Sequence, residues 1–238
     1  MTRTIEVDRR VLPLIIRRTS RKRSIGVELT CRHEVIVRVP RALSEAAIAE
    51  GVGKCLPWLR KRLALLPAVA AASVPGPGSE VLFLGEARRL AVACGQGGRP
   101  RVVACGPEVQ VMLPETCPAA GTVALREALI AWYRSQAAEV IGGLVARYST
   151  VLGVARPFFS ITGARRRWGS CGVNGRLNFA WRLVMAPLAL VEYVVVHELC
   201  HLKQRDHSPA FWAQVSAVLP DYRERRRRLH REGLRYDL

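Results

Sequence analysis

The stretch His197-Glu-Leu-Cys-His201-Leu-Lys-Gln-Arg-Asp-His207 contains three of the five histidines in the chain. Residues four apart share one face of a helix, so His197 and His201 are predicted to project side by side. Zinc binds imidazole nitrogens at ~2.0–2.1 Å, and a catalytic zinc site uses three protein ligands and leaves a fourth position for water. His207, beyond the helix, would complete the set. These three histidines are therefore the predicted zinc ligands, and the alternative is a chance pair of surface histidines.

Glu198 directly follows the first predicted ligand. A carboxylate at this position can take a proton from the water on the metal, as in the H-E-x-x-H pattern of metal-dependent proteases. Glu198 is therefore the predicted catalytic residue. Cys200 lies between two predicted ligands in sequence but would point off their helix face, so we do not include it in the site.

The flanking sequence predicts three helices around this site. Pro187 is expected at a first helical position, and the apolar run 188–196 favours a buried helix over a strand because of its length and its proline start. Ser208-Pro209 predicts a second start, with Ser208 as the cap. A third, arginine-rich helix is expected from Asp221 to about Arg231, with Gly233 just past its end as a stop signal.

Specific motifs extend over residues 165–222. They are Arg167-Trp-Gly-Ser-Cys171, Gly175-Arg-Leu-Asn178, Trp181-Arg-Leu183, Tyr193 to Leu202, His207-Ser-Pro-Ala-Phe-Trp212 and Pro220-Asp-Tyr222. They resemble the motifs of the YgjP-like metallopeptidase domain family, and an arginine-rich strand pair, a helix with Trp58 and a Leu84-Gly85 strand extend the likeness over nearly the whole chain. The resemblance implies a zincin-like fold, His197, His201 and His207 as metal ligands, and Glu198 as the catalytic acid. Gln204 stands where the metzincins have glycine, so the chain is not placed among them.

Composition indicates an ordinary globular protein, with 238 residues, 50% of them hydrophobic and 24% charged. Residues 1–8 contain no apolar signal core. The longest apolar stretch, 63–74, is short and broken by Pro67, so no membrane span is predicted. Seven cysteines without a C-x-x-C pair indicate reduced thiols and a cytoplasmic location.

Residue patterning predicts an α+β fold. Two groups of strands, in which apolar and polar residues alternate, are expected at 4–7, 12–17, 24–29 and 34–39, and at 80–84, 88–93, 101–104 and 109–113. A helix over 44–66 should kink or split at Pro57, a proline- and glycine-rich linker should cover 67–79, and one long helix should cover 122–152. Two further strands are expected at 158–162 and 176–179, on either side of a turn at Arg167-Trp-Gly-Ser170. We therefore predict a β-rich N-terminal region with one helix (1–115), followed by a zincin-like catalytic domain (116–238) that holds the H-E-x-x-H active-site helix.

The net charge of +18 predicts attraction to polyanions, although a bias toward arginine codons would give the same composition. Arg165, Arg166 and Arg167 are predicted to contact substrate, because the resembling motif puts that loop near the metal. The run Arg225 to Arg228, on a predicted helix, fits a solvated face and a binding patch equally well.

These observations predict a zinc-dependent hydrolase, specifically a metallopeptidase that cleaves peptide or protein substrates with a metal-activated water and Glu198 as general base. Tyr193, Tyr222 and the arginines at 165–167 are candidates to stabilise the oxyanion. One alternative is a metal-dependent nucleoside triphosphate pyrophosphohydrolase, although the chain lacks the carboxylate cluster that magnesium-bound phosphates need. Another is a nucleic-acid-associated protein with a structural metal site. Manganese, nickel or cobalt could occupy the same ligands.

Overall fold

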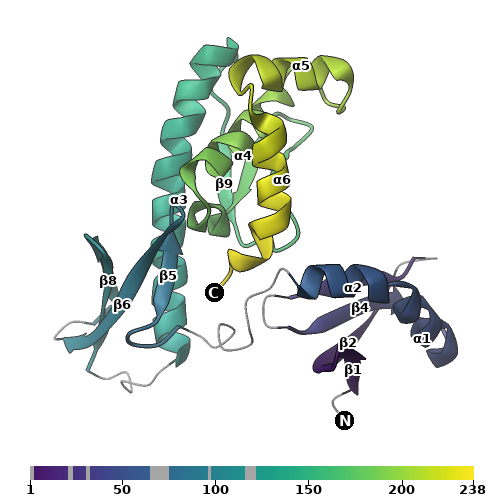
Figure 1. Cartoon of the computed structure of the whole chain (residues 1–238). Coiled ribbons are helices and arrows are strands. Elements are labelled where there is room, and N and C mark those ends of the chain that lie inside the picture. Colours follow the sequence, from purple (N-terminus) through teal and green to yellow (C-terminus); the bar gives the residue numbers. More distant parts are fainter. Residues whose placement is uncertain (1–2, 21–23, 31–32, 65–74, 96–97, 116–121) are drawn as a thin grey trace. The chain divides into compact units, whose positions relative to one another are not determined.

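The computed structural model describes residues 3–20, 24–30, 33–64, 75–95, 98–115 and 122–238. The chain forms two compact units, Met1–Ser73 and Val74–Tyr236, and each is described by itself. The mixture of sheets and helices confirms the predicted α+β class with a β-rich N-terminal region (Figure 1). No helix among the described residues is both long and apolar enough to cross a membrane.

The first unit is a four-stranded sheet followed by two helices. Its strands are β1 (Arg3–Val7), β2 (Arg10–Thr19), β3 (Gly26–Leu29) and β4 (Val35–Pro40), in the order β1-β2-β4-β3. The pair β2–β4 is parallel and the other pairs are antiparallel. The helices are α1 (Glu45–Lys54) and α2 (Leu56–Leu63), so the predicted helix over 44–66 is split. Pro57 lies in the first turn of α2, where its missing N–H leaves no helical hydrogen bond unmade.

The second unit begins with a sheet that packs on a long helix. Strands β5 (Glu80–Phe83), β6 (Glu86–Gly95), β7 (Arg101–Cys105) and β8 (Glu108–Pro114) pair in the order β5-β6-β8-β7. Alternate residues of β8 (Val109, Val111 and Leu113) are buried, as expected for a strand with one face on a core. Helix α3 (Thr122–Leu152) has the predicted bounds, and Tyr133 on it donates a hydrogen bond to the carbonyl oxygen of Leu82 at 2.6 Å.

A second sheet in this unit has the strand order β10-β11-β9, with β9 (Phe159–Thr162), β10 (Gly169–Cys171) and β11 (Leu177–Ala180). Strands β9 and β11 were predicted, whereas β10 was expected to be only a turn. Its three residues are too few to show an alternating pattern, and they become a strand by pairing with β11 at one edge of the sheet. A 3₁₀ helix over Trp181–Met185 follows and leads into the last helices.

Helix α4 (Leu188–Cys200) lies between α3 and α6 (Figure 1). Val191, Val195 and Leu199 are fully buried, which confirms the predicted buried helix. Pro187 occupies the N-cap, one position before the predicted one, because the helix begins at Leu188. Helices α5 (Pro209–Val218) and α6 (Tyr222–Glu232) complete the unit, with a final 3₁₀ turn over Gly233–Arg235.

Two predicted helix ends have the expected residues in the expected positions but not the expected capping geometry. Ser208 is the N-cap residue of α5, but its side chain makes no capping hydrogen bond. Gly233 follows α6 with a φ of −57°, so it is not a left-handed stop and the chain continues into the 3₁₀ turn. A Cβ atom at Gly233 would lie 3.1 Å from Cζ2 of Trp168. Glycine is therefore favoured there by close packing against an indole ring.

The compact second unit begins at Val74 and contains β5–β8 together with α3 and the C-terminal helices. The predicted boundary between a β-rich region (1–115) and a catalytic domain (116–238) stays a prediction. The predicted linker over 67–79 falls mostly outside the described residues, since 67–74 are not among them.

Arg225 ties α6 to α4. Its guanidinium donates to Glu192 and to the carbonyl oxygen of Ala189, each at 2.9 Å, and to both carboxylate oxygens of Asp221 at 2.9 Å. The side chains of Arg225 and Glu192 are 17% and 16% exposed. This member of the 225–228 run is therefore a structural ion-pair residue and does not belong to a solvated face or a binding patch.

We expect Arg225→Ala to lower the free energy of unfolding by about 3 kcal/mol, the lower limit of the effect of breaking a buried pair, because Glu192 would keep its charge in a mostly buried position but would retain Tyr148 and Arg147 as partners. Denaturant unfolding measures this difference. The matched control is Arg227→Ala on the same helix, whose pair with Glu224 is 74% and 58% exposed and should contribute less than about 1 kcal/mol. Equal destabilisation by the two substitutions would contradict the structural role of Arg225.

Candidate metal centre

Three imidazoles gather at the C-terminal end of α4. His197 lies in its last turn, His201 is the C-cap residue and still has helical backbone angles, and His207 lies in the loop before α5. One ring nitrogen from each lies within 4.8 Å of the others. The i and i+4 spacing on the helix and the return of the loop thus bring together the three residues singled out from the sequence.

The donor atoms suit a divalent cation. Nε2 of His197 lies 3.1 Å from Nε2 of His207, and two ligand nitrogens on a tetrahedral ion would be about 3.3 Å apart for the usual zinc–nitrogen distance. Nδ1 of His201 lies 3.0 Å from the carbonyl oxygen of Gln204. A carbonyl only accepts, so that nitrogen must carry the proton, which leaves the lone pair on Nε2 of His201. Nδ1 of His197 is buried without a hydrogen-bond partner among the described residues.

Aromatic rings from α5 surround the three imidazoles. Phe211 is fully buried and stacks on His201 with the ring centroids 4.5 Å apart, and it contacts His197 edge to face at 4.9 Å. Burial lowers the pKa of His197 to about 3, and the nearby His201, His207 and Arg226 act in the same direction. His197 is therefore neutral near pH 7, as a metal-ligating imidazole must be. The residues present fit a metal ion.

Glu198 is a buried carboxylate beside this cluster. It is 6% exposed, it lines a cavity, and it makes no hydrogen bond with any described residue. Burial raises the pKa of Glu198 to about 7, against the opposing effect of the positive charge of Arg167. Gly169 on β10 makes this position possible, because a Cβ atom there would lie 2.6 Å from Oε1 of Glu198. Burying the charged carboxylate lowers the stability of the fold, and such groups are often found in functional sites.

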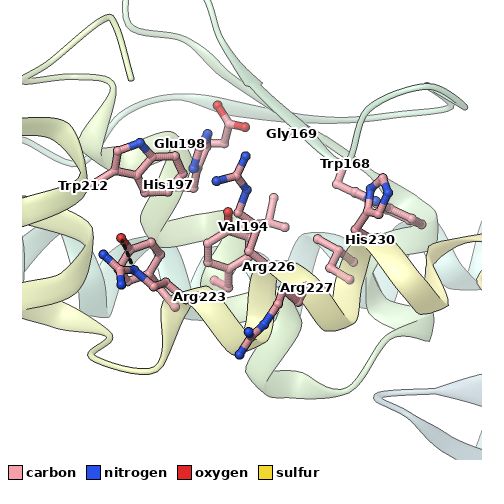
Figure 2. Close-up of a pocket in the computed structure, with 13 residues that line it drawn as sticks. Trp168, Gly169, Val194, His197, Glu198, Trp212, Arg223, Arg226, Arg227 and His230 are labelled. Carbon is pink, nitrogen blue, oxygen red and sulfur yellow. Dashed lines mark hydrogen bonds between the residues drawn. The ribbon is translucent and has the colours of Figure 1, made fainter. Parts of the chain in front are cut away.

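A cavity of about 840 Å³ opens beside His197 and Glu198 (Figure 2). Its lining comes from β10, α4, α5 and α6, together with Trp168. The aromatic members are Trp168, Tyr193, Trp212 and Tyr222, and the basic members are Arg223, Arg226, Arg227 and His230. Both tyrosines singled out as oxyanion candidates therefore face the cavity.

The three arginines of the 165–167 run differ in their surroundings. Arg167 influences Glu198 electrostatically and lines a smaller cavity of about 210 Å³ with Ser170 and Asn178. Arg165 and Arg166 are exposed and are not among the described residues that line either cavity. Contact with substrate stays a prediction for all three arginines.

Arg226 and Gly169 are the main features that sequence reasoning did not identify. Arg226 was one member of an undifferentiated arginine run, although Tyr222, Arg226 and His230 are four residues apart and share a face of α6. Gly169 was assigned to a turn, and no local signal shows that its missing side chain makes room for Glu198.

Comparison with protein families matches residues 23–232 to "YgjP-like, metallopeptidase domain". Comparison with curated proteins found no match. Among solved structures, the crystal structure of the metallopeptidase zymogen of Pyrococcus abyssi abylysin is 24% identical in sequence. That match covers 37% of this chain and 90% of the other chain, with a TM-score of 0.36.

Proposed function

The chain belongs to the YgjP-like metallopeptidase domain family, and we propose that it is a zinc-dependent peptidase with a zincin-like catalytic domain over residues 116–238. His197, His201 and His207 are its proposed metal ligands and Glu198 is its proposed catalytic residue. The substrate is a peptide or protein. Family membership implies a metal ion, and zinc is the ion that a set of three imidazoles favours.

The observation that carries this proposal is the position of Glu198. Glu198 is 6% exposed and has no hydrogen-bond partner among the described residues, and it lies directly beside a cluster of three imidazoles at the wall of a cavity. A purely structural metal site does not require such a group. A hydrolytic site does, because a proton must be removed from the attacking water.

The proposed mechanism assigns one task to each group. A metal ion held by the three histidines would act as a Lewis acid toward the scissile carbonyl and lower the pKa of water. Glu198 accepts a proton from the attacking water and returns it to the leaving amine. Tyr193 and Tyr222, which line the cavity, and the arginines at 165–167 are the proposed candidates for stabilising negative charge on the carbonyl oxygen.

A side-by-side assay tests this function. Purified protein loaded with zinc is incubated with unfolded polypeptide and, separately, with nucleoside triphosphates, each with a Glu198→Gln control. We expect cleavage of polypeptide that depends on metal and on Glu198. Hydrolysis of triphosphates alone would replace the peptidase proposal with the pyrophosphohydrolase alternative.

The two alternatives have weaker support. Glu198 is the only acidic residue among the described residues that line the cavity, so a second carboxylate for magnesium-bound phosphate is missing there. Association with nucleic acid rests on the net charge of +18 alone. Neutralising Arg225 to Arg228 together would not test it cleanly, because Arg225 holds α6 against α4.

Gly169→Ala should disturb Glu198 without touching the histidines. The new Cβ would lie 2.6 Å from Oε1 and 2.7 Å from Cγ of Glu198, so the carboxylate must move. We expect a fall in peptide turnover of about 10²-fold, the usual effect of misplacing a reacting group by about 1 Å, with metal content unchanged. Steady-state kinetics and metal analysis check both points.

The matched control is Gly143→Ala on α3, where a Cβ would meet nothing within 4 Å. It should leave turnover at the wild-type level and raise stability by up to about 1 kcal/mol through helix propensity. Wild-type turnover in Gly169→Ala would show that Glu198 does not need its present position.

A further inference from the structure

The positive charge of α6 is neutralised at most positions by carboxylates. Arg225 pairs with Glu192 and Asp221, Arg227 with Glu224, and Arg228 and Arg231 with Glu232. Arg223 and Arg226 are different, because neither has a carboxylate within ion-pair distance among the described residues. Both line the cavity beside His197 and Glu198. The cavity therefore contains two arginine charges without a neutralising partner.

Arg226 is held in place by aromatic rings. Its guanidinium lies over the indole of Trp212, 4.9 Å from the ring centroid, and that indole stacks on Tyr222 with centroids 5.2 Å apart and planes 15° apart. A stacked guanidinium loses little further freedom when it binds a ligand, so its donors are organised in advance. The side chain is exposed toward the cavity rather than buried.

The side chain of Arg226 points toward the candidate metal centre. Figure 2 shows its guanidinium reaching from α6 toward His197 and Glu198. Its charge is among the influences that lower the pKa of His197 and of His207, after burial. Arg223 precedes Arg226 by about one helical turn on the same face of α6, and it donates to the hydroxyl of Tyr222 at 3.2 Å. A substrate at the reacting centre would therefore pass close to Arg226.

We propose that Arg226, with Arg223 beside it, is a specificity-determining residue that selects peptides with a carboxylate group near the scissile bond. The inference rests on the proposed peptidase function. Arginine binds a carboxylate through two parallel hydrogen bonds, and the apolar aromatic walls strengthen that interaction by excluding water. A lysine at the same substrate position would face unpaired positive charge and is disfavoured.

The test uses short host peptides with blocked ends and no other charge, with Glu, Gln or Lys placed in turn at each position around the cleaved bond. A further peptide carries Gln and a free C-terminal carboxylate, so that the side chain and the chain end are distinguished as sources of the group. For wild-type enzyme loaded with zinc, we expect kcat/KM for the best Glu peptide to exceed that of its Gln partner by about tenfold or more, with Lys lowest. The preference should weaken at high salt.

Substitutions assign this preference to Arg226. Arg226→Ala should bring Glu and Gln peptides to equal kcat/KM, Arg226→Glu should favour Lys, and Arg226→Lys should retain part of the Glu preference. Arg231→Ala is the matched control, since it removes an arginine of the same helix that does not line the described cavity, and it should keep the full preference. Arg226→Lys also guards against loss of folding, because it keeps the charge and the aliphatic stem.

A binding measurement separates this inference from the proposed function. Trp168 and Trp212 line the cavity, so the tryptophan fluorescence of metal-free Glu198→Gln protein should respond to bound peptide. Glu peptides should bind more tightly than Gln peptides, and Arg226→Ala should remove the difference. Failure to cleave any peptide would overturn the peptidase proposal. The binding measurement would still determine the role of Arg226. Cleavage without a carboxylate preference, or a preference that survives Arg226→Ala, would overturn the inference alone.

Discussion

Glu198→Gln is expected to lower peptide turnover by about 10²–10⁴-fold, the usual contribution of a general base, while metal content and fold stay intact. The physical reason is that glutamine keeps the shape and polarity of the side chain but cannot accept a proton. Because the amide is neutral, burying it costs less free energy than burying the carboxylate in a site that is 6% exposed and has no hydrogen-bond partner among the described residues. Single-turnover kinetics and metal analysis of the same preparation measure both quantities.

Two other results would change the assignment of Glu198. Loss of metal together with activity would make it a ligand or a support for a ligand. Full activity would show that the hydrolytic mechanism is wrong. Gly169→Ala is the complementary test, because it moves the carboxylate without changing its chemistry.

Replacing any one of His197, His201 and His207 by alanine is expected to reduce metal affinity by more than about 10²-fold. Removing an outer-shell partner alone costs about 10–100-fold, and removing a ligand should cost more. Purified wild-type protein should contain about one zinc ion per chain. His207→Ala should show the smallest loss, because His207 is the exposed member of the cluster and water can take its place.

Thermal unfolding provides a second measurement of metal binding. Zinc at 100 times its dissociation constant should stabilise wild-type protein by about 2.7 kcal/mol, and this gain should disappear in the three histidine variants. His230→Ala and His33→Ala are the controls. His230 lines the same cavity without belonging to the cluster, so its variant should bind zinc normally. Full zinc occupancy in all three ligand variants would overturn the proposed site.

Features that depend on neighbours in sequence were predictable for this protein. The bounds of α3 were predicted from its own stretch of sequence, and the buried helix α4 follows from the length of its apolar run and its proline start. The proximity of His197 and His201 follows from a spacing of four residues on a helix. The break between α1 and α2 follows from Pro57. In each case the cause lies within one or two turns of the chain.

Other features depend on partners that are distant in sequence. Strand β10 exists because it pairs with β11, and three residues alone have no periodicity to detect. Gly169 matters because α4 brings Glu198 against it, and Gly233 matters because Trp168 packs there. No local pattern contains these contacts.

The arginines of α6 show most clearly the difference between features set by the local sequence and features set by tertiary packing. Sequence by itself determined that the run Arg225 to Arg228 is helical and strongly basic. Only the tertiary structure decided that Arg225 turns toward Glu192 on α4, whereas Arg226 turns toward the cavity. Adjacent residues on a helix are about 100° apart, so identical side chains meet different surroundings. Helical periodicity sets that angle, but the packing of α6 on α4 determines which residue faces the core and which faces the site.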